Sequence, residues 1–394
     1  MTAILIPADV RFPLERANGV QIVKTAAALG RAGAETTLLV RDTDPRPTEE
    51  ILPLFGVAPG ALRVRRVSVL HRRGSFFVPR AAFLARAGAA SLAALRRGAV
   101  VFTRDLQLAD LLLGLRRRAR VVYEAHAVES ILYRERGALY GTDDQPQEGK
   151  AARLRRREER VWRTARAFVT TTTGIRDTFA EEFGPRAGVA VVANGCDVPE
   201  DRAFPGLAAE DPPRILYAGQ LYPWKGVDVL VEAVARIPQA RLVILGGIPG
   251  ERDESRVRTL VASLGIADRV EMKGHVPQAE VAGELARARV VAVPVRRTAM
   301  TLRHTSPLKA FEAMAAGRPL VASDLPSSRE FLRHGENAWL VAPDDASALA
   351  AGIQALLADE ALSERIARTA FEDAVQFSWD ARARRLLDVF EATA

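Results

Sequence analysis

The chain has 394 residues, of which 48% are hydrophobic and 26% charged; this length exceeds what one core usually supports, so we expect a globular protein of two domains. The sequence has no window of about 18 uncharged apolar residues, and its N-terminus lacks a basic stretch followed by a long apolar run, so neither a membrane span nor a secretory signal is predicted. The single cysteine, Cys196, excludes an internal disulfide and fits a reducing compartment, so the expected location is the cytoplasm.

The net charge of +8 is concentrated in the first half of the chain. Residues 1–200 contain 32 Lys/Arg and 22 Asp/Glu, a balance of +10, whereas residues 201–394 contain 24 and 26, a balance of −2. Residues 51–104 contain ten arginines and no acid, and in 71–87 the arginines are mixed with apolar residues. This mixture suits an anionic membrane surface or a lipid-linked acceptor better than a nucleic acid, and solvated arginine-rich faces are the alternative reading. On the first reading, we expect residues 62–99 to associate peripherally with the inner face of a membrane. A nucleic acid partner is not expected, because no recognised binding motif accompanies the charge.

Short β-branched runs alternate with helical stretches from end to end, which predicts parallel sheets covered by helices on both faces. The predicted strands of the first half lie at 3–7, 36–40, 100–103, 120–124, 167–171 and 189–193. Those of the second half lie at 214–218, 241–246, 269–272, 290–294, 320–322 and 338–341. Segments with helical periodicity lie between them, at 20–31, 151–164, 227–237, 280–288 and 346–357.

Twelve strands are too many for one compact sheet, and the pattern restarts near residue 213, after a stretch rich in Pro, Asp and Ala. The fold class is therefore predicted as α/β with two facing, Rossmann-like, doubly wound domains, at 1–197 and 214–376, joined by a linker at 198–213. A (β/α)8 barrel is the competing fold, but it does not explain a linker in mid-chain. Ligands of doubly wound sheets bind outside the carboxyl ends of the strands, so we expect the functional residues in a cleft between the two domains.

Two features of the first half follow predicted strands. Asn18-Gly19 precedes a helix expected to start at Val20, where backbone amides are able to hold an anion, although Asn-Gly is also a plain turn. His126 comes just after the strand at 120–124, two residues from Glu124, in a position typical of catalytic groups; a structural histidine is the alternative reading.

In the second half, Lys225-Gly226 ends a strand–loop segment and opens a helix, so a cation, backbone amides and the helix dipole converge on one place. This arrangement suits a diphosphate, and the spacing does not match a P-loop. The turn that contains Gly247 follows the next strand and is a further candidate wall of the cleft.

The segment SPLKAFEAMAAGRPLVASD (306–324) predicts a helix with Ser306 as its cap, followed by a buried strand. Glu312 lies on the apolar side of this helix and needs a partner there. The carboxylate is able to accept both hydroxyls of a ribose while the amides of Leu308 and Lys309 receive phosphate. An i,i+3 pairing between Lys309 and Glu312 is the alternative.

Other chemistries have little support. The sequence has no HExxH motif, no Cys/His cluster with zinc spacing and no GxSxG elbow. Asp42-Thr-Asp44 resembles a metal-binding DxD, but it is a single short match, and no metal site is predicted.

Together these residues resemble a retaining glycosyltransferase of family 4, with the two-Rossmann GT-B architecture. The resemblance covers essentially the whole length, and the donor segment at 306–330, of the SPLK type, is its most specific motif. The other matching segments, in the expected order, are 16–33, 123–126, 170–179, 192–197, 215–233, 242–250, 270–276 and 377–392.

The resemblance implies a sugar nucleotide as donor substrate, no cofactor and no bound metal. It implies an acceptor-binding first domain, a donor-binding second domain, and a C-terminal helix, 377–394, that returns to the first domain. Glu312 would bind the ribose, Lys225 the diphosphate, and His126 would lie near the transferred sugar and the acceptor. These three are the expected catalytic residues. The other expected donor-binding residues are Gly19, Gln220, Gly247, Lys273, Gly274, His275, His304, Leu308 and Lys309.

Two positions depart from the family pattern. A Glu often stands eight residues before the ribose-binding Glu, and here that position is His304. An Arg often stands where this chain has Gln220, so one positive charge on the diphosphate is missing. We hypothesise that His304, Arg303 or Arg296 compensates.

The predicted function is transfer of a hexose or similar sugar from a nucleotide diphosphate sugar, with retention of the anomeric configuration, to a glycan, a lipid-linked molecule or a small molecule. A nucleotide-sugar isomerase of the 2-epimerase type shares this architecture, but no acid/base residues for the ring carbons are evident. A non-catalytic nucleotide-sugar-binding protein is the remaining alternative, because of His304 and Gln220.

Overall fold

A computed structural model describes residues 2–13, 16–68, 77–116, 119–247 and 250–393. The chain forms two compact units. The first comprises Met1–Tyr133, Gln147–Asn194 and Trp379–Ala394, and the second comprises Arg134–Pro146 and Gly195–Ser378. No helix within the described ranges is long and apolar enough to cross a membrane.

Within its described residues, the first unit contains a seven-stranded parallel sheet in the order β3-β2-β1-β4-β5-β6-β7. Its strands are β1 (Ala3–Phe12), β2 (Glu35–Asp42), β3 (Arg63–Ser68), β4 (Val100–Thr103), β5 (Val121–Ala125), β6 (Ala167–Thr170) and β7 (Val189–Val191). The strand order reverses direction between β1 and β4, and such a switch point is where doubly wound sheets bind ligands.

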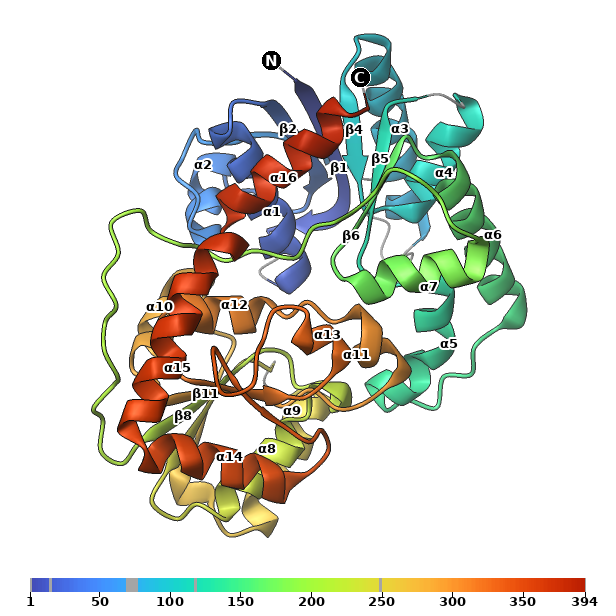
Figure 1. The fold of residues 1–394 in the computed structure, drawn as a ribbon. Coiled ribbons are helices and arrows are strands. Elements are labelled where there is room, and N and C mark those ends of the chain that lie inside the picture. The colour runs from blue at the N-terminus through green and yellow to red at the C-terminus, as the bar shows by residue number, and fades with distance from the viewer. Residues whose placement is uncertain (1, 14–15, 69–76, 117–118, 248–249, 394) are drawn as a thin grey trace. The chain divides into compact units, whose positions relative to one another are not determined.

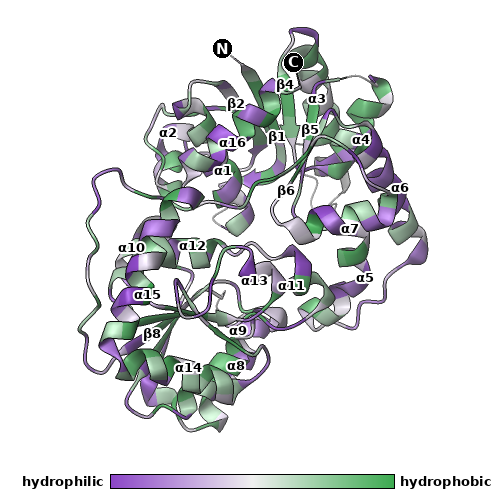
Figure 2. Cartoon of the chain, viewed as in Figure 1, coloured by the Kyte–Doolittle hydropathy of each residue, from purple (hydrophilic) through white to green (hydrophobic). Residues whose placement is uncertain are grey.

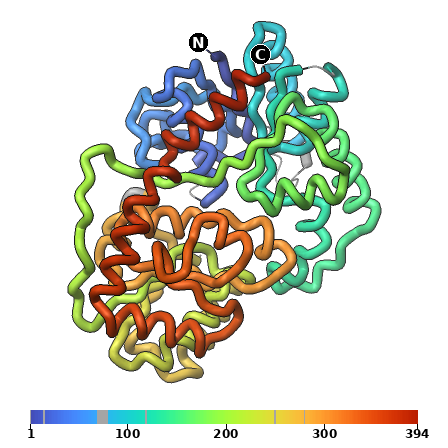
Figure 3. The backbone as a smooth tube through the Cα atoms, in the orientation of Figure 1, coloured from blue at the N-terminus to red at the C-terminus, as the bar shows by residue number. Residues whose placement is uncertain are grey.

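Helices connect these parallel strands, as right-handed crossovers require (Figure 1). They are α1 (Ala17–Arg31), α2 (Thr48–Ile51), the 3-10 helix η1 (Leu52–Phe55), α3 (Phe77–Arg96), α4 (Leu106–Leu115), α5 (Glu129–Tyr140), α6 (Glu148–Thr164) and α7 (Thr173–Phe183). The last helix of the chain, α16 (Trp379–Glu391), lies beside α1 (Figure 3), which confirms the predicted return of the C-terminus to the first domain.

The described residues of the second unit form a six-stranded parallel sheet with the same topology, in the order β10-β9-β8-β11-β12-β13. Its strands are β8 (Arg214–Ala218), β9 (Arg241–Leu245), β10 (Val270–Gly274), β11 (Val290–Val293), β12 (Leu320–Ser323) and β13 (Trp339–Val341). Its α-helices are α8 (Val227–Ala235), α9 (Arg252–Ser263), α10 (Gln278–Ala286), α11 (Ala299–His304), α12 (Leu308–Ala315), α13 (Pro326–Arg329), α14 (Ala346–Ala358) and α15 (Glu360–Asp373). Short 3-10 helices are η2 (Pro223–Lys225), η3 (Ala267–Arg269) and η4 (Ala374–Phe377).

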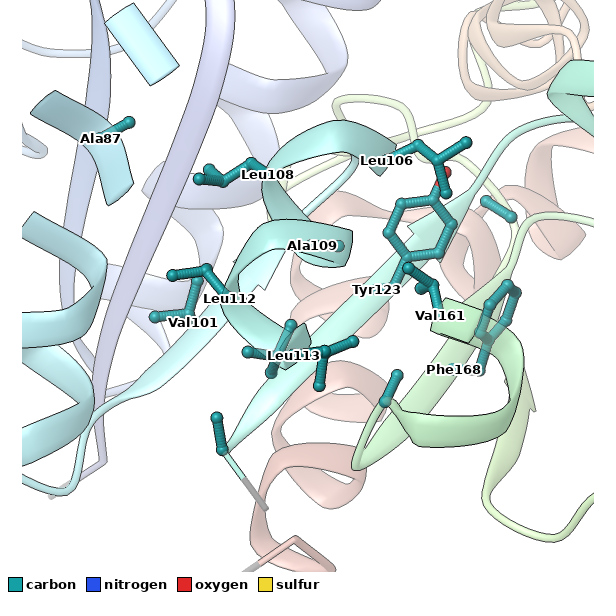
Figure 4. Close-up of a cluster of buried hydrophobic side chains, with 14 of the residues drawn as sticks. Ala87, Val101, Leu106, Leu108, Ala109, Leu112, Leu113, Tyr123, Val161 and Phe168 are labelled. Atoms are coloured by element: carbon teal, nitrogen blue, oxygen red, sulfur yellow. The ribbon is translucent and has the colours of Figure 1, made fainter. Parts of the chain in front are cut away.

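Each unit has its own hydrophobic core between sheet and helices. In the first unit, Leu106, Leu112 and Leu113 of α4 belong to one buried cluster with Tyr123 of β5 and Phe168 of β6; Figure 4 shows Leu106 beside Tyr123 and Leu112 beside Val101. Figure 2 shows hydrophobic colouring along the strands and hydrophilic colouring along α6. Burial on both faces explains why the central strands are continuous apolar runs.

All twelve predicted strands are present, and two open sheets replace the competing barrel. β3 is not among the predicted strands, because three of its six residues are arginines. β3 is the edge strand beside β2, and Arg63 and Arg66 form ion pairs with Glu35 and Asp42 at 2.9 Å and 2.6 Å. An edge strand tolerates such charges, since one of its sides faces water.

Part of the basic segment at 62–99, which was predicted to associate with a membrane, is packed within the first unit. Phe83 and Leu84 of α3 are buried in the core, and Arg80 pairs with Asp9, so these three side chains are engaged within the first unit. Residues 69–76, with Arg72, Arg73 and Phe76, lie outside the described residues. Membrane association stays a prediction.

Two stretches group differently from the boundaries expected from the sequence. Arg134–Pro146, placed by the sequence analysis in the first domain, groups with the second unit. The expected linker at 198–213 also groups with the second unit, where Arg202 donates to the Phe371 carbonyl at 2.6 Å and the ring of Phe204 packs edge-on against Phe371 at 5.8 Å.

Candidate active site

Three glycines bring the loops after β8, β9 and β10 into direct backbone contact. Gly219 donates its amide to the Leu245 carbonyl at 2.8 Å, and Gly246 donates to the Gly274 carbonyl at 2.6 Å. A Cβ atom on Gly246 would lie 1.9 Å from the Gly219 oxygen, so no other residue fits there. The next residue, Gly247, has φ +83°. The carboxyl edge of this sheet is therefore lined by backbone rather than by side chains.

Lys225 lies at the end of the loop after β8, where η2 meets α8. Gly226 has φ +71°, and a Cβ atom there would lie 1.8 Å from the Pro294 oxygen, so α8 starts directly against the end of β11. The ammonium group of Lys225 lies 4.0 Å from the centre of the Trp224 ring. Burial lowers the pKa of Lys225 to about 8.

No carboxylate forms an ion pair with Lys225 among the residues that the structure describes. A partly desolvated cation without an anion is unfavourable, and an anionic ligand at this place would relieve the cost. Lys225 thus lies beside a helix start, as the sequence predicted. Its role in binding stays a prediction.

Hydrogen bonds hold the Lys225 loop from several sides. Tyr217 donates its hydroxyl to the Gln220 carbonyl at 2.6 Å, and Arg256 donates to the Leu221 carbonyl at 2.8 Å. The amide of Arg296 donates to the Trp224 carbonyl at 2.9 Å. The loop therefore presents Lys225 from a fixed backbone.

Glu312 lies in α12, and 13% of its side chain is exposed. Lys309 donates to its carboxylate at 2.7 Å, so the i,i+3 pairing given above as the alternative is present in the structure. Gln278, at the start of α10, donates to the other carboxylate oxygen at 3.1 Å. Gln278 was missed, because nothing in its local sequence signals a contact with a helix 34 residues further on.

The predicted cap of α12 is wrong. The helix begins at Leu308 with Pro307 at the N-cap, and no side chain caps it. Because proline has no side-chain acceptor, the N-cap residue leaves the first amides of the helix, those of Leu308 and Lys309, without a side-chain cap, and this favours an anion at the helix start.

His304 and Arg296 are two of the residues hypothesised to compensate for the departures from the family pattern at His304 and Gln220. His304 is buried, and burial, followed by the charge of Arg303, lowers the pKa of His304 to about 4. Its imidazole is neutral at pH 7 and supplies no charge in place of the Arg absent at Gln220. Arg296 donates to Asp228 at 2.7 Å and to Asp344 at 3.2 Å, so its guanidinium is engaged in ion pairs.

The remaining donor-binding candidates of the second unit lie at the end of β10. Lys273 forms an ion pair with Glu284 at 2.8 Å and lies 3.7 Å from Glu271. Gly274 has φ +67°, and His275 is exposed. The ammonium of Lys273 is thus bound by acids of its own unit.

In the first unit, His126 follows β5, and its Nε2 atom lies 3.2 Å from the carboxylate of Glu124, so the predicted Glu–His neighbourhood is confirmed. Burial lowers the pKa of His126 to about 4; the charge of Arg104 acts in the same direction, and the Glu124 carboxylate opposes both. The side chain is 22% exposed, so a neutral imidazole with one accessible face stands at this strand end.

Glu124 is bound by Arg382 of α16, and both side chains are only 1% exposed. Burial alone would raise the pKa of Glu124, but the charges of Arg382 and His126 hold it well below its ordinary value. Arg382 also donates to the carbonyls of Val192 and Ala193, each at 2.7 Å. It therefore fixes the strand end from which His126 projects.

The sequence analysis missed Arg382. Its signal was an arginine on the apolar face of the last helix, which is formed by Trp379, Ala383, Leu386 and Phe390. A charge within such a stripe requires a buried partner, but the partner, Glu124, is 258 residues away.

A cavity of about 190 Å³ lies within the first unit at the ends of β1, β4 and β5, next to the switch point. Its polar lining includes Asn18, Gln21, Arg80, Arg104, Glu124 and Glu129. Arg104 donates to Gln21 at 2.7 Å. Gly19 is buried in the first turn of α1, which starts three residues earlier than predicted.

Asp42 and Asp44, the weak DxD match, are both paired with arginines. Arg66 lies 2.6 Å from Asp42, and Arg46 lies 2.9 Å from Asp44.

Comparisons with known proteins agree with this arrangement. Residues 18–195 match the family model described as glycosyl transferase 4-like domain, and residues 199–373 match the model described as glycosyl transferases group 1. The D-inositol 3-phosphate glycosyltransferase of Xylanimonas cellulosilytica is 32% identical over 249 residues, which are 59% of this chain and 58% of that protein. The chain thus matches little more than half the length of this relative.

Among solved structures, the sucrose-phosphate synthase of Thermosynechococcus elongatus aligns with a TM-score of 0.75 at 22% identity, over 99% of this chain and 98% of that one. HepE of Anabaena, solved in complex with UDP-glucose, aligns with a TM-score of 0.72 at 18% identity, over 99% and 100%. These likenesses show that the two Rossmann-like units have the GT-B class of fold. The chain belongs to the group 1 family of glycosyl transferases, which confirms the resemblance found in the sequence.

Proposed function

We propose that this chain is a glycosyltransferase that moves a hexose or similar sugar from a nucleotide diphosphate sugar to an acceptor, with retention of the anomeric configuration. The observation that carries the proposal is Lys225: a partly buried cation at a helix start, beside a sheet edge lined by glycine backbone, and without an acidic partner among the described residues. A diphosphate supplies the missing negative charge.

Two further parts of the second unit support a sugar nucleotide. The uncapped start of α12 offers amides to phosphate. Glu312 lies one turn further along the helix, and Lys309 and Gln278 fix its carboxylate, which is suited to accept hydroxyls of a ribose.

In this proposal the basic groups and amides stabilise the charge of the departing diphosphate, so no bound metal is required. His126 is neutral at pH 7 and so acts as a hydrogen-bonding group at the sugar rather than as a cation. The polar cavity of the first unit is the proposed acceptor region, and glycan, lipid-linked and small-molecule acceptors all remain within the proposal.

The test is a panel of UDP-, GDP- and ADP-sugars, starting with UDP-glucose, incubated with the protein and EDTA. Release of nucleoside diphosphate from one donor, with an α-linked product from an α-linked donor by NMR, is the expected result. A product in which the sugar is still bound to the nucleotide but changed at a ring carbon would favour an isomerase instead. Donor binding without any product would favour a non-catalytic binding protein.

A further inference from the structure

The segment Arg134–Pro146 lies between elements of the first unit in sequence but packs with the second unit. It contains the C-terminal part of α5 and the turn that follows it. The turn is folded back on the helix, since the Thr142 amide donates to the Gly137 carbonyl at 2.9 Å. The sequence analysis gave this segment no role.

At its tip the segment contacts the loop that carries Lys225. The rings of Tyr140 and Tyr222 meet edge to face, with centres 4.9 Å apart and an interplanar angle of 82°. Gly141 has φ +59°, and a Cβ atom there would lie 3.3 Å from Pro223 and 3.1 Å from the guanidinium of Arg252. The backbone thus approaches the loop closely at a position that favours glycine.

Tyr222 and Pro223 are the residues that set the position of Lys225. The Lys225 amide donates to the Tyr222 carbonyl at 2.9 Å, and the Gly226 amide donates to the Pro223 carbonyl at 3.1 Å. A shift of Tyr222 therefore moves the backbone from which the Lys225 side chain projects. The hydrogen bonds from Arg256 and Arg296 hold Leu221 and Trp224, and the Tyr140 contact holds Tyr222, one of the two residues between them.

The same segment also contacts α11. Burial raises the pKa of Glu135 and the nearby backbone of Met300 opposes this shift, so Glu135 lies near α11, which ends at His304, the position where the family pattern has an acid. One segment therefore contacts both the Lys225 loop and the helix that leads to the donor motif.

We propose that Tyr140 and Gly141 are positioning residues for Lys225. The edge-to-face ring contact and the close approach of Gly141 hold the Tyr222–Lys225 turn in the geometry that presents the ammonium to the donor's diphosphate. This inference rests on the proposed function for the identity of the ligand, but the bracing of the loop itself is independent of it.

The test compares Tyr140→Leu, which removes the ring, with Tyr140→Phe, which keeps it. Tyr133→Leu is the matched control, because it removes an aromatic ring from the same helix, and this ring contacts Lys150 and its hydroxyl accepts from the Gln147 amide, both of the first unit. Gly141→Ala is a second perturbation of the same contact. Thermal unfolding shows that each variant is folded.

Two readouts are made on the full chain. Hydrogen exchange of a peptide covering residues 219–227 is followed without ligand, and affinity is measured for whichever of UDP, GDP and ADP the wild type binds most tightly. Tyr140→Leu is expected to speed exchange at the Lys225 and Gly226 amides and to weaken affinity about two- to tenfold, the range of an aromatic pair. Tyr140→Phe and Tyr133→Leu are expected to behave as the wild type in both.

Unchanged exchange in Tyr140→Leu would overturn the bracing of the loop, whatever the ligand. Faster exchange with unchanged nucleotide affinity would overturn the link to the donor site. If the wild type binds none of the three nucleotides, the proposed function fails and this link fails with it, while faster exchange in Tyr140→Leu still supports the bracing.

Discussion

Lys225 lies beside a tryptophan ring and backbone, and no carboxylate forms an ion pair with it among the described residues. Its pKa of about 8 lies below the ordinary value of 10.5, because burial disfavours the charged form. A bound diphosphate favours the charged form, so the pKa of Lys225 rises in the complex and binding is coupled to proton uptake above pH 8.

Affinity for a nucleoside diphosphate is therefore expected to be highest below pH 8 and to fall as the pH rises through 8 towards the raised pKa of the complex. Calorimetric titration between pH 7 and 10 measures this. Lys225→Arg, which stays charged, is expected to flatten the profile, and Lys225→Met to weaken binding about 10- to 100-fold at pH 7. A wild-type profile as flat as that of Lys225→Arg would contradict the assignment.

Glu312 tests recognition of the ribose. If its carboxylate accepts ribose hydroxyls, the wild type is expected to bind a nucleoside diphosphate about tenfold or more tightly than the 2′-deoxy form. Glu312→Ala is expected to bind both forms equally, with the affinity for inorganic pyrophosphate unchanged, because the diphosphate contacts lie elsewhere. Competition titrations give all three values. Equal loss for both nucleotides and for pyrophosphate would show that Glu312 supports the fold of the site rather than the ribose.

At the scale of elements, α16 attaches to the first unit through two ion pairs of opposite character. Arg382–Glu124 is almost fully buried, whereas Arg31–Asp380 is about half exposed on both sides. The first pair connects α16 to the strand end that carries His126, and the second lies on the surface between α1 and α16.

Arg382→Leu leaves the Glu124 carboxylate buried without its main partner, so we expect the free energy of unfolding to fall by about 3–5 kcal/mol. Asp380→Asn, the matched control on the same helix, is expected to cost about 0–1 kcal/mol. Denaturant unfolding curves measure both values. Similar small losses in the two variants would mean that α16 is held by its apolar face alone.

The strands that sequence predicted with the right bounds are buried on both faces of a parallel sheet. The strands at 100–103 and 214–218 consist mainly of apolar residues and match β4 and β8 residue for residue. β3 lies at the edge of its sheet and contains three arginines, so it lacks the apolar pattern by which a buried strand is predicted. Lys225 and His126 were found because functional residues of doubly wound sheets lie in the loops after strands. Glu312 was found because it is an acid on the apolar side of a predicted helix.

The contacts that escaped prediction join residues far apart in the chain. Arg382 pairs with Glu124, Gln278 reaches Glu312, and Tyr140 meets Tyr222. The local sequence does not identify the partner in any of these pairs, since the pairing depends on how helices are placed on the sheets. The prediction of Ser306 as the helix cap was wrong for the opposite reason. Its local sequence pattern was favourable, but the N-cap residue in the structure is Pro307.

At the scale of the whole molecule, the two units repeat one topology and use it differently. The second unit lines its sheet edge with glycine backbone and one lysine without an acidic partner among the described residues, an arrangement for phosphate. The first unit instead has a polar cavity whose lining includes arginines and acids. It also has the neutral histidine His126, which follows β5. This division is the basis for assigning donor and acceptor to separate units.

The most direct measurement is the release of nucleoside diphosphate from the best donor by the wild type, by Lys225→Met and by Tyr133→Leu, at equal concentrations of folded protein. The account predicts steady release by the wild type and by Tyr133→Leu, and a loss of about 10-fold or more in kcat/KM for the donor in Lys225→Met. Equal rates in all three proteins, or no release from any UDP-, GDP- or ADP-sugar, would contradict it.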